Sequence, residues 1–205
     1  MAGPGSRRFL IVVASGYAAS IAAYSKLPGP YQLSIAFLLP TTAALIYALV
    51  RRVWERDLVR DRDEAFEPSY GAIVFAVVLF VIAIHVMVLA ALTGAVPAQR
   101  VWLVLRTTIV LVGLLVARVG NLLPRTRPNL ALGIRTPRTL RSRALWMQTH
   151  RTAGYVAVCL GAVFVVSGAF LSKQAIESVM GPAVLSAAAV ILISHYRYSR
   201  TKQTS

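Results

Sequence analysis

The sequence predicts an all-α fold: a polytopic membrane protein built as a bundle of about six transmembrane helices. Hydrophobic residues make up 57% of the 205-residue chain. A soluble domain of this length could not bury so much apolar surface, so lipid is the expected solvent. The apolar residues form six runs of roughly 20 residues, the length at which a helix crosses a bilayer. Basic residues gather in alternate connections between these runs, which is typical of multi-pass membrane proteins.

Hydropathy predicts where each helix lies, and the flanking charges predict its direction. The six expected helices are Phe9–Ser25, Tyr31–Val50, Gly71–Thr93, Val101–Leu122, Ala153–Ser172 and Ser178–Tyr196. Five arginines follow the second helix and seven lie between the fourth and fifth, whereas the other connections carry only Lys26, Arg100 or Lys173. Because Lys and Arg are retained in the cytosol, we expect both termini and the two long arginine-bearing loops there.

The chain divides into two sequence segments. Residues 1–70 hold the first two helices and a charged loop, and residues 71–205 hold four helices and the arginine loop 120–152. The first helix has a second interpretation, because Arg7–Arg8, a short apolar run and the small residues Ala22–Ala23 also suit a cleaved signal peptide. Cleavage would leave five membrane helices.

The net charge of +15 does not indicate nucleic-acid binding. The basic residues stand in short pieces between membrane helices, where they act as orientation signals. They also attract anionic lipid headgroups, at about 1 kcal/mol per basic residue near the surface. Anionic headgroups are therefore expected partners, and direct nucleic-acid binding is not expected.

Several residues inside the predicted helices are expected to shape helices or to help them pack. Pro40 lacks an amide donor and is expected to kink the second helix. Gly154, Gly161 and Gly168 recur every seven residues and leave a groove for another helix, which we expect to be the sixth. The single cysteine, Cys159, excludes an internal disulfide, and we expect a small buried packing residue.

Ionisable groups are scarce at membrane depth. No Asp or Glu lies within the six predicted helices, which argues against a proton- or sodium-coupled transporter. Arg106 and Arg118 lie near helix ends and can extend to the surface. His85 lies near the middle of the third helix. A neutral imidazole hydrogen-bonded to a neighbouring helix explains it most simply, and a proton relay or ligand contact is the alternative.

The two long loops differ in charge. Carboxylates of the first loop region are Glu55, Asp57, Asp61, Asp63, Glu64 and Glu67, and the remaining one of the chain's seven is Glu177. The arginine loop has none. We therefore predict that the two loops dock against each other. The alternative is a solvated helical extension of the second helix, held by charge pairs at helical spacing.

The arginine loop contains residues that are typical of helix ends and helix starts. Gly120–Asn121 is expected to end the fourth helix in a left-handed conformation. Thr136–Pro137 predicts a helix start, with threonine as the N-cap and proline at the first position, and Ser142 is a second possible cap. An interfacial helix over Leu140–Arg151 would follow. It would place Trp146 and His150 on one face, with the tryptophan as an interfacial anchor.

The chemistry of this loop allows three interpretations. Arginines and backbone amides near a helix start suit an anion, such as a lipid headgroup or a phosphate. Positive charge in a cytosolic loop also follows from membrane topology alone. Catalysis with His150 as a base and Thr136, Ser142 or Thr149 as nucleophile lacks an orienting carboxylate. His150 and His195 without a third ligand do not indicate a metal site, and no cofactor is expected.

The sequence motifs of the arginine loop resemble those of a known family. The matching residues are Gly120–Asn121, Arg127–Pro128–Asn129, Gly133–Ile134–Arg135–Thr136–Pro137, Thr139–Leu140, Trp146, Thr149–His150–Arg151 and Gly154. This succession resembles the SdpI family of bacterial membrane immunity proteins. Relatives tend to have an aromatic residue in place of Arg138 and acidic residues in place of Arg143–Ala144, so this loop is more basic.

The resemblance implies a non-enzymatic protein of the bacterial plasma membrane that protects against a secreted toxic peptide. It also implies signalling in some systems, by holding a cytosolic repressor at the membrane. The residues that the resemblance places in binding or signalling are Arg127, Asn129, Gly133, Arg135, Thr136, Pro137, Trp146, His150 and Arg151. Two alternatives stay open: a membrane enzyme or carrier that handles lipid or phosphate, and a relative without a toxin that acts in envelope stress.

Overall fold

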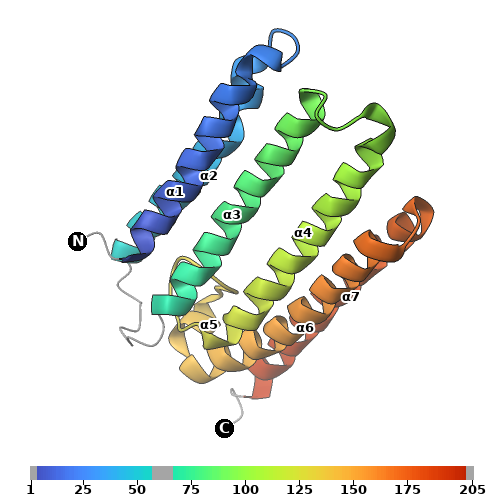
Figure 1. The fold of residues 1–205 in the computed structure, drawn as a ribbon. Coiled ribbons are helices and arrows are strands. Elements are labelled where there is room, and N and C mark those ends of the chain that lie inside the picture. The colour runs from blue at the N-terminus through green and yellow to red at the C-terminus, as the bar shows by residue number, and fades with distance from the viewer. Residues whose placement is uncertain (1–3, 57–66, 202–205) are drawn as a thin grey trace. The chain divides into compact units, whose positions relative to one another are not determined.

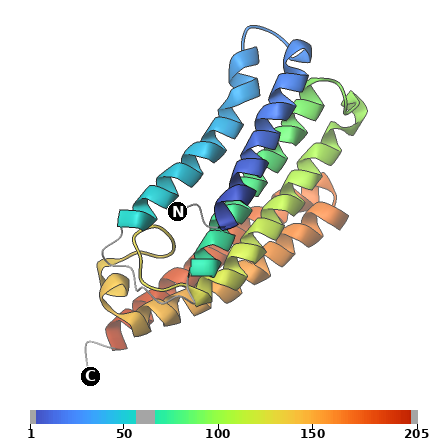
Figure 2. The same ribbon diagram turned by 60° about the vertical axis from the view of Figure 1, so that its left-hand side comes forward.

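The structure is a computed structural model, and it describes residues 4–56 and 67–201. These residues form α-helices, short 3-10 turns and connecting loops (Figures 1 and 2). The α-helices are α1 (Pro4–Ala23), α2 (Gln32–Arg56), α3 (Glu67–Leu92), α4 (Val101–Leu122), α5 (Pro137–Arg141), α6 (Arg143–Phe170) and α7 (Lys173–Thr201). All except α5 are long and apolar enough to cross a membrane. The predicted all-α, six-span membrane fold is confirmed.

Several helices extend beyond their apolar runs. α2 continues to Arg56, α6 begins at Arg143 and α7 begins at Lys173. The end of α2 agrees with the helical extension given as the alternative for the first loop, and the start of α6 overlaps the helix predicted over Leu140–Arg151. The start of α7 was predicted at Ser178, because hydropathy detects only the part of a helix that suits lipid. A polar extension outside the membrane keeps its backbone hydrogen bonds without an apolar face.

The helices belong to two compact units, and each is described by itself. Unit 1 contains residues Met1–Arg51 and Val74–Thr108, and unit 2 contains Arg52–Ile73 and Ile109–Ser205. Both ends of the first long loop therefore lie in the unit that holds the arginine loop. The loop carboxylates Asp61, Asp63 and Glu64 lie outside the described residues, so the predicted docking of the two loops stays a prediction.

Unit 1 is organised around a hairpin of α1 and α2. The chain turns through a 3-10 helix at Tyr24–Lys26, and Leu27, Ala36 and Leu89 form a buried cluster beside it. Further along the hairpin, the Phe9 ring stacks on Tyr47 with centroids 4.3 Å apart. These contacts hold the hairpin against the part of α3 that belongs to the same unit.

A buried polar pair lies inside unit 1. His85 of α3 is fully buried, and its Nε2 atom lies 2.8 Å from Ser20 Oγ of α1. Ser20 also hydrogen-bonds the carbonyl oxygens of Gly16 and Ala36. The prediction that His85 bonds to a neighbouring helix is confirmed. Pro40 lies inside α2 and is buried.

Unit 2 is held by glycine contacts between α4 and α6. A Cβ on Gly161 would lie 2.5 Å from the carbonyl oxygen of Gly113, and one on Gly154 would lie 2.7 Å from that of Gly120. The reverse substitutions meet the opposite carbonyl at 2.6 and 2.8 Å. Only residues without a side chain let the two backbones approach this closely.

These contacts correct two sequence predictions, and the exposure of Cys159 corrects a third. The partner of Gly154 and Gly161 is α4 rather than α7, although α7 also packs along α6 (Figure 1). α4 ends at Leu122 as its predicted bounds had it, but Gly120 does not adopt the predicted left-handed conformation, because this glycine serves close packing rather than a turn. Cys159 is exposed on α6 rather than buried.

Candidate functional site

The segment that joins α4 to α6 folds into a compact structure, which we call the cap (residues 123–151). It begins with a 3-10 helix at Leu123–Arg125, continues as a loop, forms the short helix α5 and ends on the first turns of α6. The predicted interfacial helix over Leu140–Arg151 is therefore wrong in one respect. The chain breaks at Ser142, whose hydroxyl caps α6 by accepting from the amide of Leu145 at 3.3 Å.

A stacked pair of rings forms the centre of the cap. Trp146 and His150 lie one helical turn apart on α6, with ring centroids 3.9 Å apart and an interplanar angle of 14°. Both side chains are 0% exposed. The prediction that they share one face is confirmed, but the prediction that Trp146 anchors at the bilayer surface is wrong. The cap covers this face of α6, so the indole packs against protein.

Trp146 fastens the beginning of the cap to α6. Its Nε1–H donates to the carbonyl oxygen of Thr126 at 3.1 Å. Thr126 is itself buried, and its amide and hydroxyl both donate to the carbonyl oxygen of Leu123, at 3.1 and 2.7 Å. The end of the 3-10 helix is thus held at a fixed position on the tryptophan.

His150 fastens the middle of the cap. The amide of Ile134 donates to His150 Nε2 at 3.0 Å, and His150 Nδ1 lies 2.8 Å from the carbonyl oxygen of Trp146. A backbone amide can only donate and a carbonyl can only accept, so the ring is neutral with its proton on Nδ1. Both ring nitrogens are used in holding the loop.

The conformation of Gly133 follows from the position of His150. Gly133 has φ +102°, a left-handed value that side chains disfavour. A Cβ there would overlap His150 Nε2 and lie 3.0 Å from its Cδ2. Glycine is therefore required twice, once for the backbone angle and once for the space that the imidazole occupies.

The remaining motif residues close local turns. Asn129 is buried, its Oδ1 accepts from the amides of Ala131 and Leu132 at 2.9 and 2.7 Å, and its Nδ2 donates to the carbonyl oxygen of Arg127 at 2.7 Å. This is an Asx turn with every polar atom of the amide in use. In the described part of the chain, no buried side-chain nitrogen or oxygen of the cap lacks a hydrogen-bond partner.

The predicted start of α5 is confirmed. Thr136 is the N-cap, its hydroxyl accepts from the amide of Thr139 at 3.1 Å, and Pro137 occupies the first turn. Thr139 completes a capping box by accepting from the amide of Thr136 at 2.9 Å, and its hydroxyl also reaches the carbonyl oxygen of Ile134 at 2.9 Å. The start of α5 is therefore hydrogen-bonded to Ile134, the residue whose amide donates to His150.

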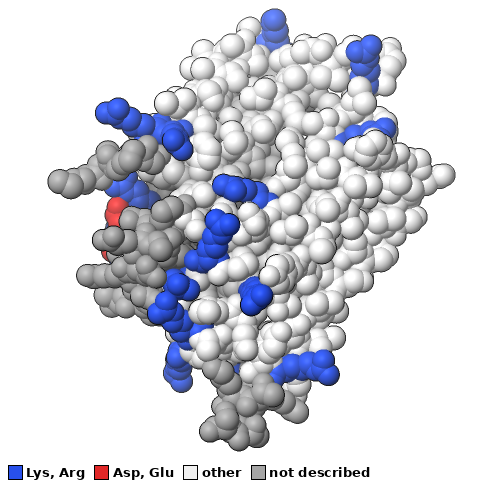
Figure 3. All heavy atoms as spheres, turned by 60° about the horizontal axis from the view of Figure 1, so that its bottom comes forward, with Lys and Arg blue, Asp and Glu red and all other residues white. Residues whose placement is uncertain are grey.

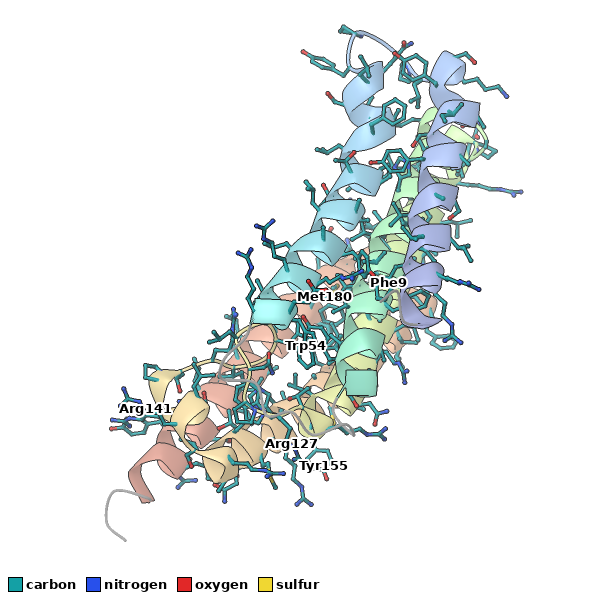
Figure 4. All side chains as sticks on the ribbon, turned by 90° about the vertical axis from the view of Figure 1, so that its left-hand side faces the viewer. Phe9, Trp54, Arg127, Arg141, Tyr155 and Met180 are labelled. Atoms are coloured by element: carbon teal, nitrogen blue, oxygen red, sulfur yellow. The ribbon has the colours of Figure 1, made fainter. Side chains whose placement is uncertain are left out.

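The arginines form the outer surface of the cap. The exposed ones are Arg125, Arg135, Arg138, Arg141, Arg143 and Arg151, and Arg127 is half-buried. Blue Lys and Arg groups are spread over the face that carries the cap, with little red among the described residues (Figure 3). Arg141 lies on the outer side of α5 (Figure 4). The cap therefore presents cations outward around a buried neutral interior.

The predicted site residues fall into three groups by exposure. Asn129, Trp146 and His150 are buried, Arg127 and Thr136 are half-buried, and Gly133, Arg135, Pro137 and Arg151 are exposed. Sequence reasoning missed Thr126 and Thr139, which are fully buried and bond to distant parts of the loop. Thr139 belongs to the matching residues of the resemblance but was not predicted to bind or signal, and Thr126 is an ordinary polar residue that nothing in the sequence marks.

The arrangement supplies no ready chemistry around His150. Its two nitrogens are occupied by backbone groups, so it does not act as a base toward Thr136, Ser142 or Thr149 in this conformation. Thr149 instead lies 3.3 Å from Nδ1 of His195. Across residues 4–56 and 67–201, no three His, Cys, Asp or Glu residues gather as a metal site would require.

Comparison with known proteins identifies this region. Residues 125–196 carry the signature of the SdpI/YfhL protein family. The resemblance found in the sequence is confirmed, and the SdpI/YfhL signature covers nearly all of the cap, α6 and most of α7. No curated protein and no solved structure matches the chain.

Proposed function

We propose that this chain is a non-enzymatic immunity protein of the bacterial plasma membrane, in which the membrane helices engage a secreted toxic peptide and the cap acts on the cytosolic side. The proposal joins the multi-pass membrane fold to the SdpI/YfhL signature. The role of the cap is binding rather than catalysis, because the groups that could perform chemistry are committed to internal hydrogen bonds.

The proposal rests on one observation: within the cap, several neutral motif residues are buried and most of the arginines are exposed. Buried motif residues such as Trp146, His150 and Asn129 hold the loop in one shape. The arginines that this shape displays are exposed. A surface held this firmly by neutral side chains suits recognition of an acidic partner, since ordered guanidinium groups pair with carboxylates in two parallel hydrogen bonds.

Arg135 is the best placed of these arginines. It lies between Ile134, whose amide bonds to His150, and the N-cap Thr136, so its backbone is fixed on both sides. Its Nη1 hydrogen-bonds the carbonyl oxygen of Leu130, which orients the guanidinium on the surface of the cap. We expect it to contact an acidic surface of a cytosolic signalling partner, such as a repressor held at the membrane.

A tolerance assay tests the proposal. The gene would be expressed in a bacterium sensitive to the toxic peptide of an SdpI-type system, and survival compared for the wild type, Arg135→Ala and Arg100→Ala. Arg100 is a matched control, because it is an exposed arginine in the α3–α4 connection, outside the cap. Membrane levels of each variant would be measured by immunoblot.

We expect the wild type and Arg100→Ala to protect the host and Arg135→Ala to lose protection at an unchanged membrane level. Arg135→Lys keeps the charge but loses the forked geometry, so it should protect only weakly. Full protection by Arg135→Ala would reject the role of the cap. Failure of the wild type to protect, at normal membrane level, would reject the immunity function itself.

A further inference from the structure

We infer that unit 2 binds one anionic phospholipid in a hollow between α5 and the last turns of α7. The hollow has a volume of about 550 Å³ and is lined by Thr136, Pro137, Arg138, Leu192, His195 and Tyr196. All six residues belong to the same compact unit. This lipid site goes beyond the immunity function and does not depend on it.

The walls of the hollow suit an acyl chain. Leu192 is 67% exposed and Tyr196 is 53% exposed, although both are large apolar side chains. Pro137 of α5 also lines the hollow. An open apolar hollow on a membrane protein is covered by apolar material, and lipid is the apolar material that surrounds this surface.

An apolar stripe continues from the hollow toward the middle of the membrane. Leu185, Leu192 and Tyr196 share one face of α7 at spacings of seven and four residues, and Leu185 is 71% exposed. The eleven residue-to-residue steps from Leu185 to Tyr196 span about 16 Å at 1.5 Å per step. Half of the hydrocarbon core is about 15 Å thick, so the stripe matches one leaflet. A soluble acidic peptide could occupy the hollow but could not follow this stripe.

The hollow also has a cation that can pair with the phosphate of a lipid. Arg138 lines the hollow and is exposed, and Arg141 follows one helical turn later on α5. No carboxylate occurs in the sequence between Pro68 and Ile176, so none in this stretch competes for these guanidinium groups. Arginine binds phosphate through two parallel hydrogen bonds. Tyr196 lies near the end of the apolar span Lys173–Tyr198, the depth at which tyrosine and headgroups meet.

The hollow is also shaped by bonds that exist without lipid. Thr136 and Pro137 are fixed by the capping box of α5. His195 is held from the other side by its contact with Thr149 Oγ1 at 3.3 Å. The two walls are therefore ordered before a ligand arrives, which lowers the entropy lost on binding.

The experiment measures lipid binding by the purified full chain in a neutral detergent. Native mass spectrometry would count bound lipid while phosphatidylglycerol or phosphatidylcholine is titrated, with glycerol 3-phosphate as a soluble source of the same phosphate. We expect one tightly bound phosphatidylglycerol, and phosphatidylcholine weaker by about tenfold or more, because its choline offsets the phosphate charge. Glycerol 3-phosphate should neither bind at the same concentration nor displace the lipid.

Two variants and a control locate the site. Arg138→Gln should weaken phosphatidylglycerol about tenfold and remove the preference over phosphatidylcholine. Leu192→Trp fills the hollow and should remove both lipids. Arg125→Gln removes the same charge from an exposed arginine outside the hollow and should leave binding unchanged. Equal binding of both lipids by the wild type, displacement by glycerol 3-phosphate, or an equal effect of Arg125→Gln and Arg138→Gln would each overturn the inference.

Discussion

The sharpest structural prediction concerns Gly133→Ala. The backbone at Gly133 has φ +102°, and holding alanine in such a sparsely populated region costs about 1–3 kcal/mol. The new methyl group also overlaps His150 Nε2, so the ring must move away from the amide of Ile134. Leaving that buried donor without a partner costs about 1–3 kcal/mol more. We expect a total loss of about 2–6 kcal/mol, a large part of a typical folding free energy.

Gly94→Ala is the matched control for this prediction. Gly94 also has a positive φ, +78°, but a Cβ there meets nothing within 4 Å. It should therefore show the backbone cost alone, about 1–3 kcal/mol. Both variants would be unfolded in detergent solution by SDS titration, and deuterium uptake of residues 126–139 would report the cap directly. Only Gly133→Ala should increase uptake in that segment.

A double-mutant cycle tests the cause. His150→Ala removes the ring that the new methyl group strikes, so in that background Gly133→Ala should cost only the backbone strain, about 1–3 kcal/mol. The reasoning is refuted if Gly133→Ala is no more destabilising than Gly94→Ala, or if its cost is the same with and without the imidazole.

Three further substitutions follow from single contacts, each measured by the same unfolding assay. Gly161→Ala places a methyl group 2.5 Å from a backbone oxygen of α4 and should destabilise the protein by about 1–3 kcal/mol. Gly71→Ala is the control, because a Cβ there meets nothing within 4 Å, and it should stabilise the protein by up to about 1 kcal/mol. A stable Gly161→Ala protein would contradict the glycine contact. Trp146→Phe loses the indole donor and should cost about 1–3 kcal/mol with faster exchange at residues 123–127. Unchanged exchange would show that the hydrogen bond from Trp146 to Thr126 does not hold the beginning of the cap. Ser20→Ala leaves His85 Nε2 buried without its hydroxyl partner and should also cost about 1–3 kcal/mol; a neutral effect would show that this pair does not hold unit 1.

The sequence was informative wherever one helical turn decides the structure. Thr136 and Ser142 cap helices as predicted, because an N-cap bonds to an amide two or three residues away. The shared face of Trp146 and His150 was predictable for the same reason. Which way that face points was not, since a tryptophan near the membrane boundary suits both an anchor and a buried contact.

Contacts between distant residues lay beyond prediction. Gly133 and Gly120 look like turn glycines, yet one makes room for a ring seventeen residues later and the other for a backbone in another helix. Thr126 gains its role only because the indole of Trp146 reaches it across twenty residues. Such roles depend on how helices meet, and a single sequence carries no direct signal for that.

The central claim is that the cap displays its arginines on the cytosolic side of the membrane. Cysteine labelling in intact cells tests it most directly, in a Cys159→Ala background that removes the single native cysteine. Arg135→Cys in the cap and Ser172→Cys in the α6–α7 connection are both exposed positions. A membrane-impermeant maleimide should label Ser172→Cys in intact cells and Arg135→Cys only after permeabilisation. Labelling of Arg135→Cys in intact cells would contradict the account.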